Sequence, residues 1–257
     1  MKEGMNLDRK NNGMTMAASA PITSSVTAGA MGCSEQKTVS MYRIVLASIS
    51  LFFLGMGCRQ QASDKALPYY NAPDFTPIFL KRADRVEKTI THTIGKFALK
   101  NQDGEAFSEQ DVQGKIQVAN FFFTGCGSIC PGMMSKLRKL NSELVKDQSI
   151  VFLSFSVTPW RDSVSRLREY ANTNKIIAPN WHLLTGSKAD IYSLARRSYF
   201  AEEALGFTKD STDFLHTEHV LLVDKTGRIR GIYNGTLELD MEQLSKDIKV
   251  LKAEDVD

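Results

Sequence analysis

Two cysteines, Cys126 and Cys130, stand four residues apart in a glycine-containing turn. The turn follows the apolar run 116–123, which is typical of a buried strand. Pro131 comes next, and it suits the first turn of a helix because its missing N–H would have no partner there. Apolar residues then continue with helical spacing. We therefore expect both thiols where a central strand passes into a helix.

This placement suits reactive thiols. A helix N-terminus favours a thiolate and lowers the pKa of a nearby cysteine. A separation of four residues brings two side chains to one face of a helical turn. Such a pair can hold a metal, form a reversible disulfide, or do both. The alternatives are a stable buried disulfide or two inert core thiols. The chain has four cysteines in 257 residues, too few for a disulfide scaffold.

The late apolar run 220–223 helps to choose between a metal and a simple redox pair. Thioredoxin-like redox motifs are usually C-x-x-C, and such oxidoreductases keep a proline before a late strand. Here the spacing is C-x-x-x-C, and no proline follows Pro179. His219 stands before the late run instead, and two thiolates with an imidazole suit copper. Glu218 or Asp213 could orient its ring.

The other three histidines are weaker ligand candidates. His216 lies three residues before His219, in a loop rather than at a strand edge. His92 and His182 are expected to be solvent-exposed or satisfied by neighbouring groups. His219 is therefore the histidine that we expect beside the cysteine turn.

The patterns around these residues predict one α/β domain with a central mixed sheet. Its order, β-α-β-α-β-α-β-β-α, with the cysteines after the first long strand, is the thioredoxin arrangement. The long irregular stretch 199–218 is expected to be functional. The expected elements are hairpins within 94–107 and 219–233, strands at 116–123, 150–157 and 181–184, and helices at 131–146, 163–173, 187–195 and 240–251.

The N-terminal part is expected to target and tether this domain. Residues 1–40 have no sustained periodicity and are expected to be disordered, or to precede the true start. Residues 41–57 form a basic n-region and an apolar h-region, too short for a span of about 20 residues. Cys58 follows, as in a bacterial lipoprotein signal; an uncleaved anchor or a secretory signal are the alternatives. Prolines predict an extended tether at 58–93, before the domain at 94–253.

Three segments together resemble the Sco/SenC family, which assembles the copper centre of cytochrome c oxidase. They are Phe-Phe-Phe-Thr-Gly-Cys-Gly-Ser-Ile-Cys-Pro at 121–131, Phe-Ser-Val-Thr-Pro-Trp-Arg-Asp at 155–162 and Glu-His-Val-Leu-Leu-Val-Asp at 218–224. The likeness covers about residues 66–252 and keeps the order and spacing of the family. It departs from the usual family pattern at Gly127, Ser128, Thr158 and Glu218.

The resemblance implies a thioredoxin-like fold and a copper ion, Cu(I) or Cu(II), bound by Cys126, Cys130 and His219. It also implies a redox-active cysteine pair that forms a disulfide. The domain would lie on the outer, periplasmic side of a bacterial membrane, anchored by lipid on Cys58 or by an uncleaved segment. The partner would be a cytochrome c oxidase subunit or another copper acceptor.

The function expected from these residues is copper delivery, with two alternatives. One is a thiol-disulfide oxidoreductase that reduces the cysteines of a target copper site. The other is a redox-sensing or peroxide-reducing domain with one nucleophilic cysteine. Metal ligation requires His219, whereas neither alternative does. The net charge of +3 is too small to indicate a nucleic acid as a partner.

Overall fold

The computed structural model describes residues 66–80, 85–201 and 218–254. The expectations for residues 1–57, for Cys58, and for His216 and Asp213 lie outside this part of the chain. Within the described ranges, none of the helices combines the length and the apolar character that crossing a membrane requires.

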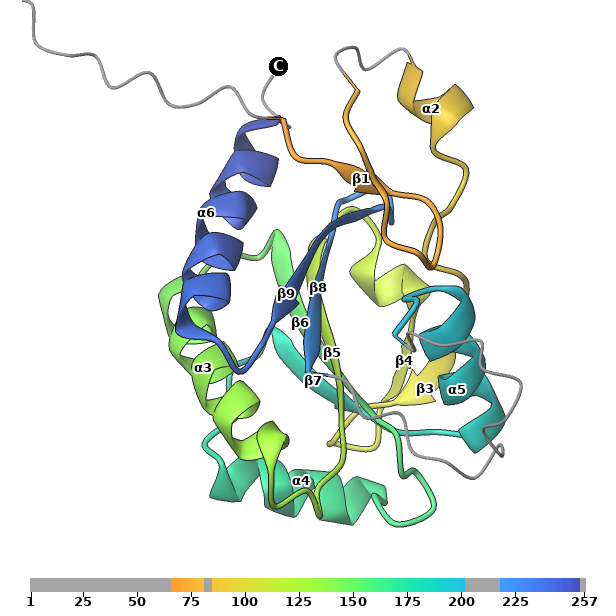
Figure 1. The fold of residues 1–257 in the computed structure, drawn as a ribbon. Helices are drawn as coiled ribbons and strands as arrows, with labels where there is room; N and C mark the ends of the chain where they lie inside the picture. Colours follow the sequence, from red (N-terminus) through yellow and green to blue (C-terminus); the bar gives the residue numbers. More distant parts are fainter. Residues whose placement is uncertain (1–65, 81–84, 202–217, 255–257) are drawn as a thin grey trace, which may run out of the picture. The chain divides into compact units, whose positions relative to one another are not determined.

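The centre of the fold is a seven-stranded mixed sheet with strand order β2-β1-β9-β8-β5-β6-β7 (Figure 1). Strands β5, β6 and β7 run parallel, and β8 runs antiparallel to β5. Every residue of β5 and β6 is buried, as expected for strands covered on both faces. The strands are β1 Tyr69–Tyr70, β2 Pro77–Ile78, β5 Ile116–Phe122, β6 Ile150–Ser156, β7 Trp181–Leu184, β8 His219–Val223 and β9 Ile229–Asn234.

Helices cover both faces of the sheet. Helices α3, α4 and α6 pack on one face, and α5 with the small hairpin β3–β4 packs on the other (Figure 1). The hairpin forms its own two-stranded sheet, with Leu99 opposite Phe107. The bounds of these elements are β3 Ala98–Lys100, β4 Ala106–Ser108, η2 Glu109–Val112, α2 Val86–Thr89, α3 Ile129–Leu144, α4 Val164–Thr173, α5 Lys188–Arg197 and α6 Glu238–Glu254.

Two hydrophobic clusters fill the space between the sheet and its two covers. Along β5 the side chains alternate between them, with Val118 in the cluster under α3 and Ala119 in the cluster under α5. Cys130 belongs to the cluster under α3. Helix α3, which carries Cys130, therefore packs on the same face of the sheet as Val118.

The thioredoxin-like α/β fold is confirmed, and so is the position of the late strand. β8 lies beside β5, with Val220 opposite Asn120. The hairpins before β5 and at β8–β9 are both present. Expected helix bounds shift slightly, because α3 begins at Ile129 and α6 at Glu238. Asp240 lies within the first turn of α6 and accepts the Asn234 N–H at 2.7 Å.

The segment expected to be an extended tether differs from that expectation. Residues 69–70 and 77–78 form β1 and β2, which extend the sheet at its β9 edge. Helix α2 follows within the same segment. Pro77 lies in β2, the outermost strand, where a missing N–H is tolerated. Part of the predicted tether is therefore an edge of the folded domain.

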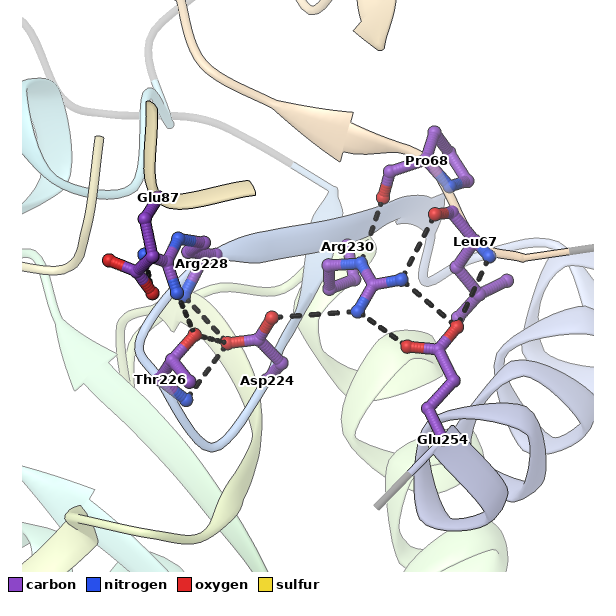
Figure 2. A network of polar contacts seen from close by, with 8 residues as sticks. All are labelled: Leu67, Pro68, Glu87, Asp224, Thr226, Arg228, Arg230 and Glu254. Carbon is purple, nitrogen blue, oxygen red and sulfur yellow. Dashed lines mark hydrogen bonds and ion pairs between the residues drawn. The ribbon is translucent and has the colours of Figure 1, made fainter. Parts of the chain in front are cut away.

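A buried arginine in β9 fixes the start of this segment to the last helix (Figure 2). The Arg230 guanidinium donates to both carboxylate oxygens of Glu254, at 2.8 and 3.0 Å. It also donates to the carbonyl oxygens of Leu67 and Pro68, at 3.0 and 3.1 Å. Asp224 lies 3.5 Å away on the other side. The chain entering the domain is thus held against the C-terminal end of α6.

Candidate metal centre

The two cysteines meet in the turn between β5 and the start of α3. Cys126 is partly exposed in the turn, whereas Cys130 is buried in the first helical turn. The Cys130 N–H donates to Cys126 Sγ at 3.5 Å, and the Cys126 N–H donates to the Phe123 carbonyl oxygen at 3.2 Å. Both thiols are free. The predicted strand-to-helix position of the pair is confirmed.

The two thiols have opposite acid–base character. Burial raises the pKa of Cys126, but hydrogen bonds from the Cys130 thiol and from the N–H groups of Cys130, Ser128 and Ile129 outweigh it, so the pKa is lowered. Burial, together with the hydrogen bond to Cys126, raises the pKa of Cys130 to about 12. Cys126 is therefore the thiol that ionises first and meets incoming reagents or metal.

A buried carboxylate holds the cysteine turn in place. Asp162 accepts hydrogen bonds from Ser156 Oγ at 2.6 Å and Thr158 Oγ1 at 2.8 Å, both from the end of β6 and the loop after it. It also accepts from the Thr124 N–H at 3.2 Å and from Thr124 Oγ1 at 2.5 Å. Thr124 lies two residues before Cys126. Asp162 therefore ties the loop after β6 to the start of the cysteine turn.

Sequence reasoning missed this role. It predicted only a helix from residue 163, and in the structure Ser163 caps that helix, because its Oγ accepts the Arg166 N–H at 3.3 Å. The available signal was the cluster of small hydroxyl residues, Ser156, Thr158 and Thr124, after two strands. Because β5 and β6 are parallel neighbours, their C-terminal ends lie at the same end of the sheet, and these hydroxyl groups can surround a carboxylate there.

His219 is the first residue of β8 and is partly exposed. Since β8 runs antiparallel to β5, His219 lies at the sheet end where β5 passes into the cysteine turn. Its neighbour Val220 packs with Cys130 under α3, whereas Leu221 packs under α5. Alternation therefore places the His219 side chain on the α5 face of the sheet.

The three candidate ligands lie at one end of the sheet, but the His219 side chain does not lie beside the two cysteines. Cys126 and Cys130 are in contact, while His219 faces away from them toward the other cluster. Across residues 66–80, 85–201 and 218–254, no three His, Cys, Asp or Glu side chains lie close enough together to hold a metal. The donor chemistry nevertheless fits copper, which soft thiolates and imidazole both suit.

Of the other two described histidines, His92 is satisfied by a neighbouring group as expected, whereas the buried His182 Nδ1 has no hydrogen-bond partner among the described residues. His92 Nε2 lies 2.8 Å from the Ser198 carbonyl oxygen, and its ring stacks on Phe200. His182 packs against the Phe107 ring, and burial lowers its pKa.

Of the two acidic residues expected near His219, only Glu218 is described. Its carboxylate accepts a hydrogen bond from Asn234 Nδ2 at 3.5 Å, across the β8–β9 pair. The backbone carbonyl of Glu218 accepts the Gly235 N–H at 2.8 Å. These contacts fix the backbone that precedes His219.

Comparison with known proteins identifies the family. The family model described as SCO1/SenC matches residues 85–253. A curated relative, the SCO1 protein homolog of Bacillus subtilis, is 28% identical over 167 residues, covering 64% of this chain and 86% of that protein.

Solved structures agree in fold. A SCO1/SenC family lipoprotein from Bacillus anthracis is 29% identical, with a TM-score of 0.55, over 63% of this chain and 95% of that one. BsSco, described as having a disulfide switch and as a member of the Sco family of cytochrome c oxidase assembly proteins, is 27% identical, with a TM-score of 0.54 over 63% and 94%. Copper-bound ScoI of Bradyrhizobium japonicum is 25% identical, with a TM-score of 0.50 over 62% and 99%. This chain therefore belongs to the SCO1/SenC family.

Proposed function

We propose that this protein binds copper through Cys126, Cys130 and His219 and delivers it to cytochrome c oxidase or a related copper acceptor. The observation that carries the proposal is the pair of contacting thiols at the end of β5, with an imidazole at the same sheet end. Two relatives support it, since ScoI has been solved with copper and BsSco is described among oxidase assembly proteins.

The exposure and pKa of the two cysteines indicate the order in which they bind the metal. Cys126 is partly exposed and has the lower pKa, so it offers the thiolate that first meets the metal. Cys130 must lose its proton when it binds, so copper uptake releases protons. Two soft thiolates and one imidazole suit Cu(I), and a three-ligand set leaves the ion able to exchange. The partly exposed Cys126 is then the ligand that an acceptor reaches first.

A second function, thiol-disulfide exchange, is favoured by the contrast between the two thiols. The Cys126 thiolate would attack a disulfide in a target, forming a mixed disulfide and releasing one target thiolate. Cys130 would then attack Cys126, closing the Cys126–Cys130 disulfide and releasing the second target thiol. The target is reduced by two electrons and this protein is oxidised by two. Such a step would prepare the cysteines of a target copper site.

Copper titration of the reduced protein separates the two functions. We expect the His219→Ala variant to bind Cu(I) at least 10- to 100-fold more weakly, the loss typical of even an outer ligand contact. The Cys126→Ala variant should lose tight binding. His92→Ala is the matched control, because that imidazole is committed to the Ser198 carbonyl, and its affinity should not change.

A negative result would favour the enzyme. If the affinity of His219→Ala equals that of the unaltered protein while both thiols are reduced, the main reason for preferring copper delivery disappears. Thiol-disulfide exchange would then be the better account, since it does not use the imidazole.

We further propose that the domain works at the outer face of a bacterial membrane, anchored through Cys58. The support is the basic and apolar segment 41–57 that precedes this cysteine. A family relative from Bacillus anthracis is itself described as a lipoprotein.

A further inference from the structure

The loop after β6 carries an exposed tryptophan at the same end of the sheet as the cysteine turn. Strands β5, β6 and β7 run parallel, so the segments that follow them lie at one end of the sheet. These segments are the cysteine turn, the loop after β6 and the start of α5. Trp160 lies in the loop and is 52% exposed, although tryptophan is on average a highly buried residue.

Three hydrogen bonds hold this loop in place. The Asp162 carboxylate accepts from Thr124 Oγ1 at 2.5 Å, and the Asp162 carbonyl oxygen accepts from Thr185 Oγ1 at 2.8 Å. The Tyr192 hydroxyl donates to the Val157 carbonyl oxygen at 3.0 Å. A loop that is already ordered has less conformational entropy to lose when it binds a partner.

A lysine from the first turn of α5 lies against the exposed ring. Lys188 Nζ is 4.9 Å from the centroid of the Trp160 ring and 5.3 Å from that of the Tyr192 ring, both within cation–π range. Because Tyr192 is buried, it fixes the lysine against the exposed tryptophan. A rigid, exposed aromatic ring beside a cation is the kind of side chain that contributes most to protein–protein binding.

Other cations surround this ring at the cysteine end of the sheet. Arg161 is the next residue along the chain and is exposed. Arg166 is also exposed, and its Nε donates to Thr124 Oγ1 at 3.2 Å, two residues before Cys126. The Glu169 carboxylate lies 3.5 Å from Arg166 in an exposed ion pair, which leaves the other two cations uncompensated by it.

A surface groove of about 550 Å³ along α5 extends the positive surface. Its described lining includes three cations and no acidic residue. The lining residues are Lys188, Ala189, Tyr192, Ser193, Arg196 and Arg197. Asp190, an acidic residue of the same helix, lines a different groove beside the β3–β4 hairpin. The charge of this face therefore complements an acidic partner.

We propose that Trp160, Arg161, Arg166 and Lys188, here named the Trp160 surface, dock an acidic segment of the protein whose disulfide Cys126 attacks. The aromatic ring supplies apolar contact area, and the cations select the sign of the partner's charge. The inference rests on the proposed thiol-disulfide exchange and names the partner class for it. It does not involve His219 or a bound metal ion.

The first test measures docking without chemistry. Two peptides of equal length, one rich in glutamate and one rich in lysine, with serines in place of cysteines and no tryptophan, are added to the reduced protein. Trp181, the other tryptophan of the chain, is 1% exposed, so acrylamide quenches mainly Trp160. We expect the acidic peptide to protect the fluorescence and the basic peptide to leave it unchanged. Equal protection by both, or by neither, would overturn the inference.

The second test measures exchange with disulfide-bonded forms of the same peptides. Each turnover reduces one peptide disulfide to two thiols and oxidises Cys126 and Cys130 to a disulfide. Each rate is divided by that of dithiothreitol, which corrects for the intrinsic reactivity of the peptide. We expect the acidic peptide to react about 10-fold faster than the basic one at low salt. The advantage should disappear near 1 M salt, where the screening length is about 3 Å.

Substitution assigns this preference to the Trp160 surface. Arg161→Gln/Lys188→Gln should bring the ratio of the two rates close to one. Lys146→Gln/Lys225→Gln is the matched control, because it removes the same charge from the end of the sheet where β5 begins. This control should keep the preference. Equal ratios in the two double variants would overturn the inference, since net charge alone would then explain the preference.

Failure of the docking surface and failure of the exchange function give different results. If the acidic peptide protects Trp160 but neither disulfide is reduced, the exchange function fails and the surface stands. If both disulfides are reduced equally fast and protection is absent, exchange stands and the surface has no docking role. Binding to phosphatidylglycerol vesicles that Arg161→Gln/Lys188→Gln abolishes, without preference between the peptides, would replace the acidic protein partner with a membrane.

Discussion

At the scale of single residues, the site is defined by two thiols of unequal character. Cys126 has a lowered pKa and is partly exposed, whereas burial helps raise the pKa of Cys130 to about 12. A lower pKa means a larger thiolate fraction at neutral pH, and thiolate is the form that alkylates. We predict that iodoacetamide labels Cys126 well before Cys130 in the reduced, copper-free protein, as measured by peptide mass spectrometry.

The pH dependence of the labelling rates tests whether the difference between the two thiols comes from their pKa values. Labelling of Cys126 should reach its half-maximal rate at a lower pH than that of a free thiol, because its pKa is lowered, while labelling of Cys130 should still be rising at pH 10. After mild air oxidation, a disulfide between the two should block both until reductant is added. Equal labelling rates for the two cysteines at pH 7 would contradict the assignment.

The sequence predicted these two thiols and the position of His219, because each belongs to a short motif next to a strong strand pattern. It could not predict Asp162 or Phe75. Asp162 is hydrogen-bonded to Thr124, and the Phe75 ring packs against His219; only the folded chain brings these pairs together. Periodicity describes one segment at a time, so such contacts leave no signal in it.

At the scale of elements, the cysteine turn depends on its attachment to the loop after β6. We predict that Asp162→Asn destabilises the protein by about 1–3 kcal/mol, because an amide leaves some of the buried donors around it unpaired. Four donors from Thr124, Ser156 and Thr158 point at this carboxylate. Urea unfolding measures the loss.

Asp103→Asn is the matched control, because that carboxylate is exposed and 3.6 Å from Arg168 Nε. Exposed pairs of this kind contribute about 0–1 kcal/mol. If Asp162→Asn is as mild as Asp103→Asn, Asp162 does not anchor the turn.

Elements with a strong pattern were predicted, and short ones were not. The strand at 181–184 and the helix after Ser163 occur where the sequence pattern predicted them. Strands β1 and β2 have two residues each, too few to show any period, and prolines nearby favoured an extended chain. They form because the exposed edge of β9 accepts β1, which is a property of the sheet rather than of the segment.

At the scale of the whole domain, the entering chain and the cysteine turn lie at opposite ends of the sheet (Figure 1). Arg230 follows Ile229, which pairs with Val223, and Val223 pairs with Gln117 near the start of β5. The cysteine turn follows the other end of this seven-residue strand. At about 3.3 Å per residue, β5 separates the two by roughly 23 Å.

The Arg230 contacts should govern how firmly the entering chain is held. We predict that Arg230→Met destabilises the protein by about 1–3 kcal/mol, because it leaves the Leu67 and Pro68 carbonyl oxygens and the partly exposed Glu254 carboxylate without their donor. Hydrogen exchange at Tyr69 and Tyr70 should accelerate more than exchange in β5. Arg138→Met is the control, since Arg138 is exposed and makes one bond to a carbonyl. Equal stability of the two variants would show that the network does not hold the segment.

The last prediction concerns how the chain is anchored. We predict that the mature protein begins at a lipid-bearing Cys58, as mass spectrometry of the membrane fraction would show. The sequence support is the basic and apolar segment 41–57 that ends directly before this cysteine. Cys58→Ser should abolish lipidation and Cys33→Ser should not. A mature chain that retains residues 41–57 would contradict lipidation and leave an uncleaved anchor in its place.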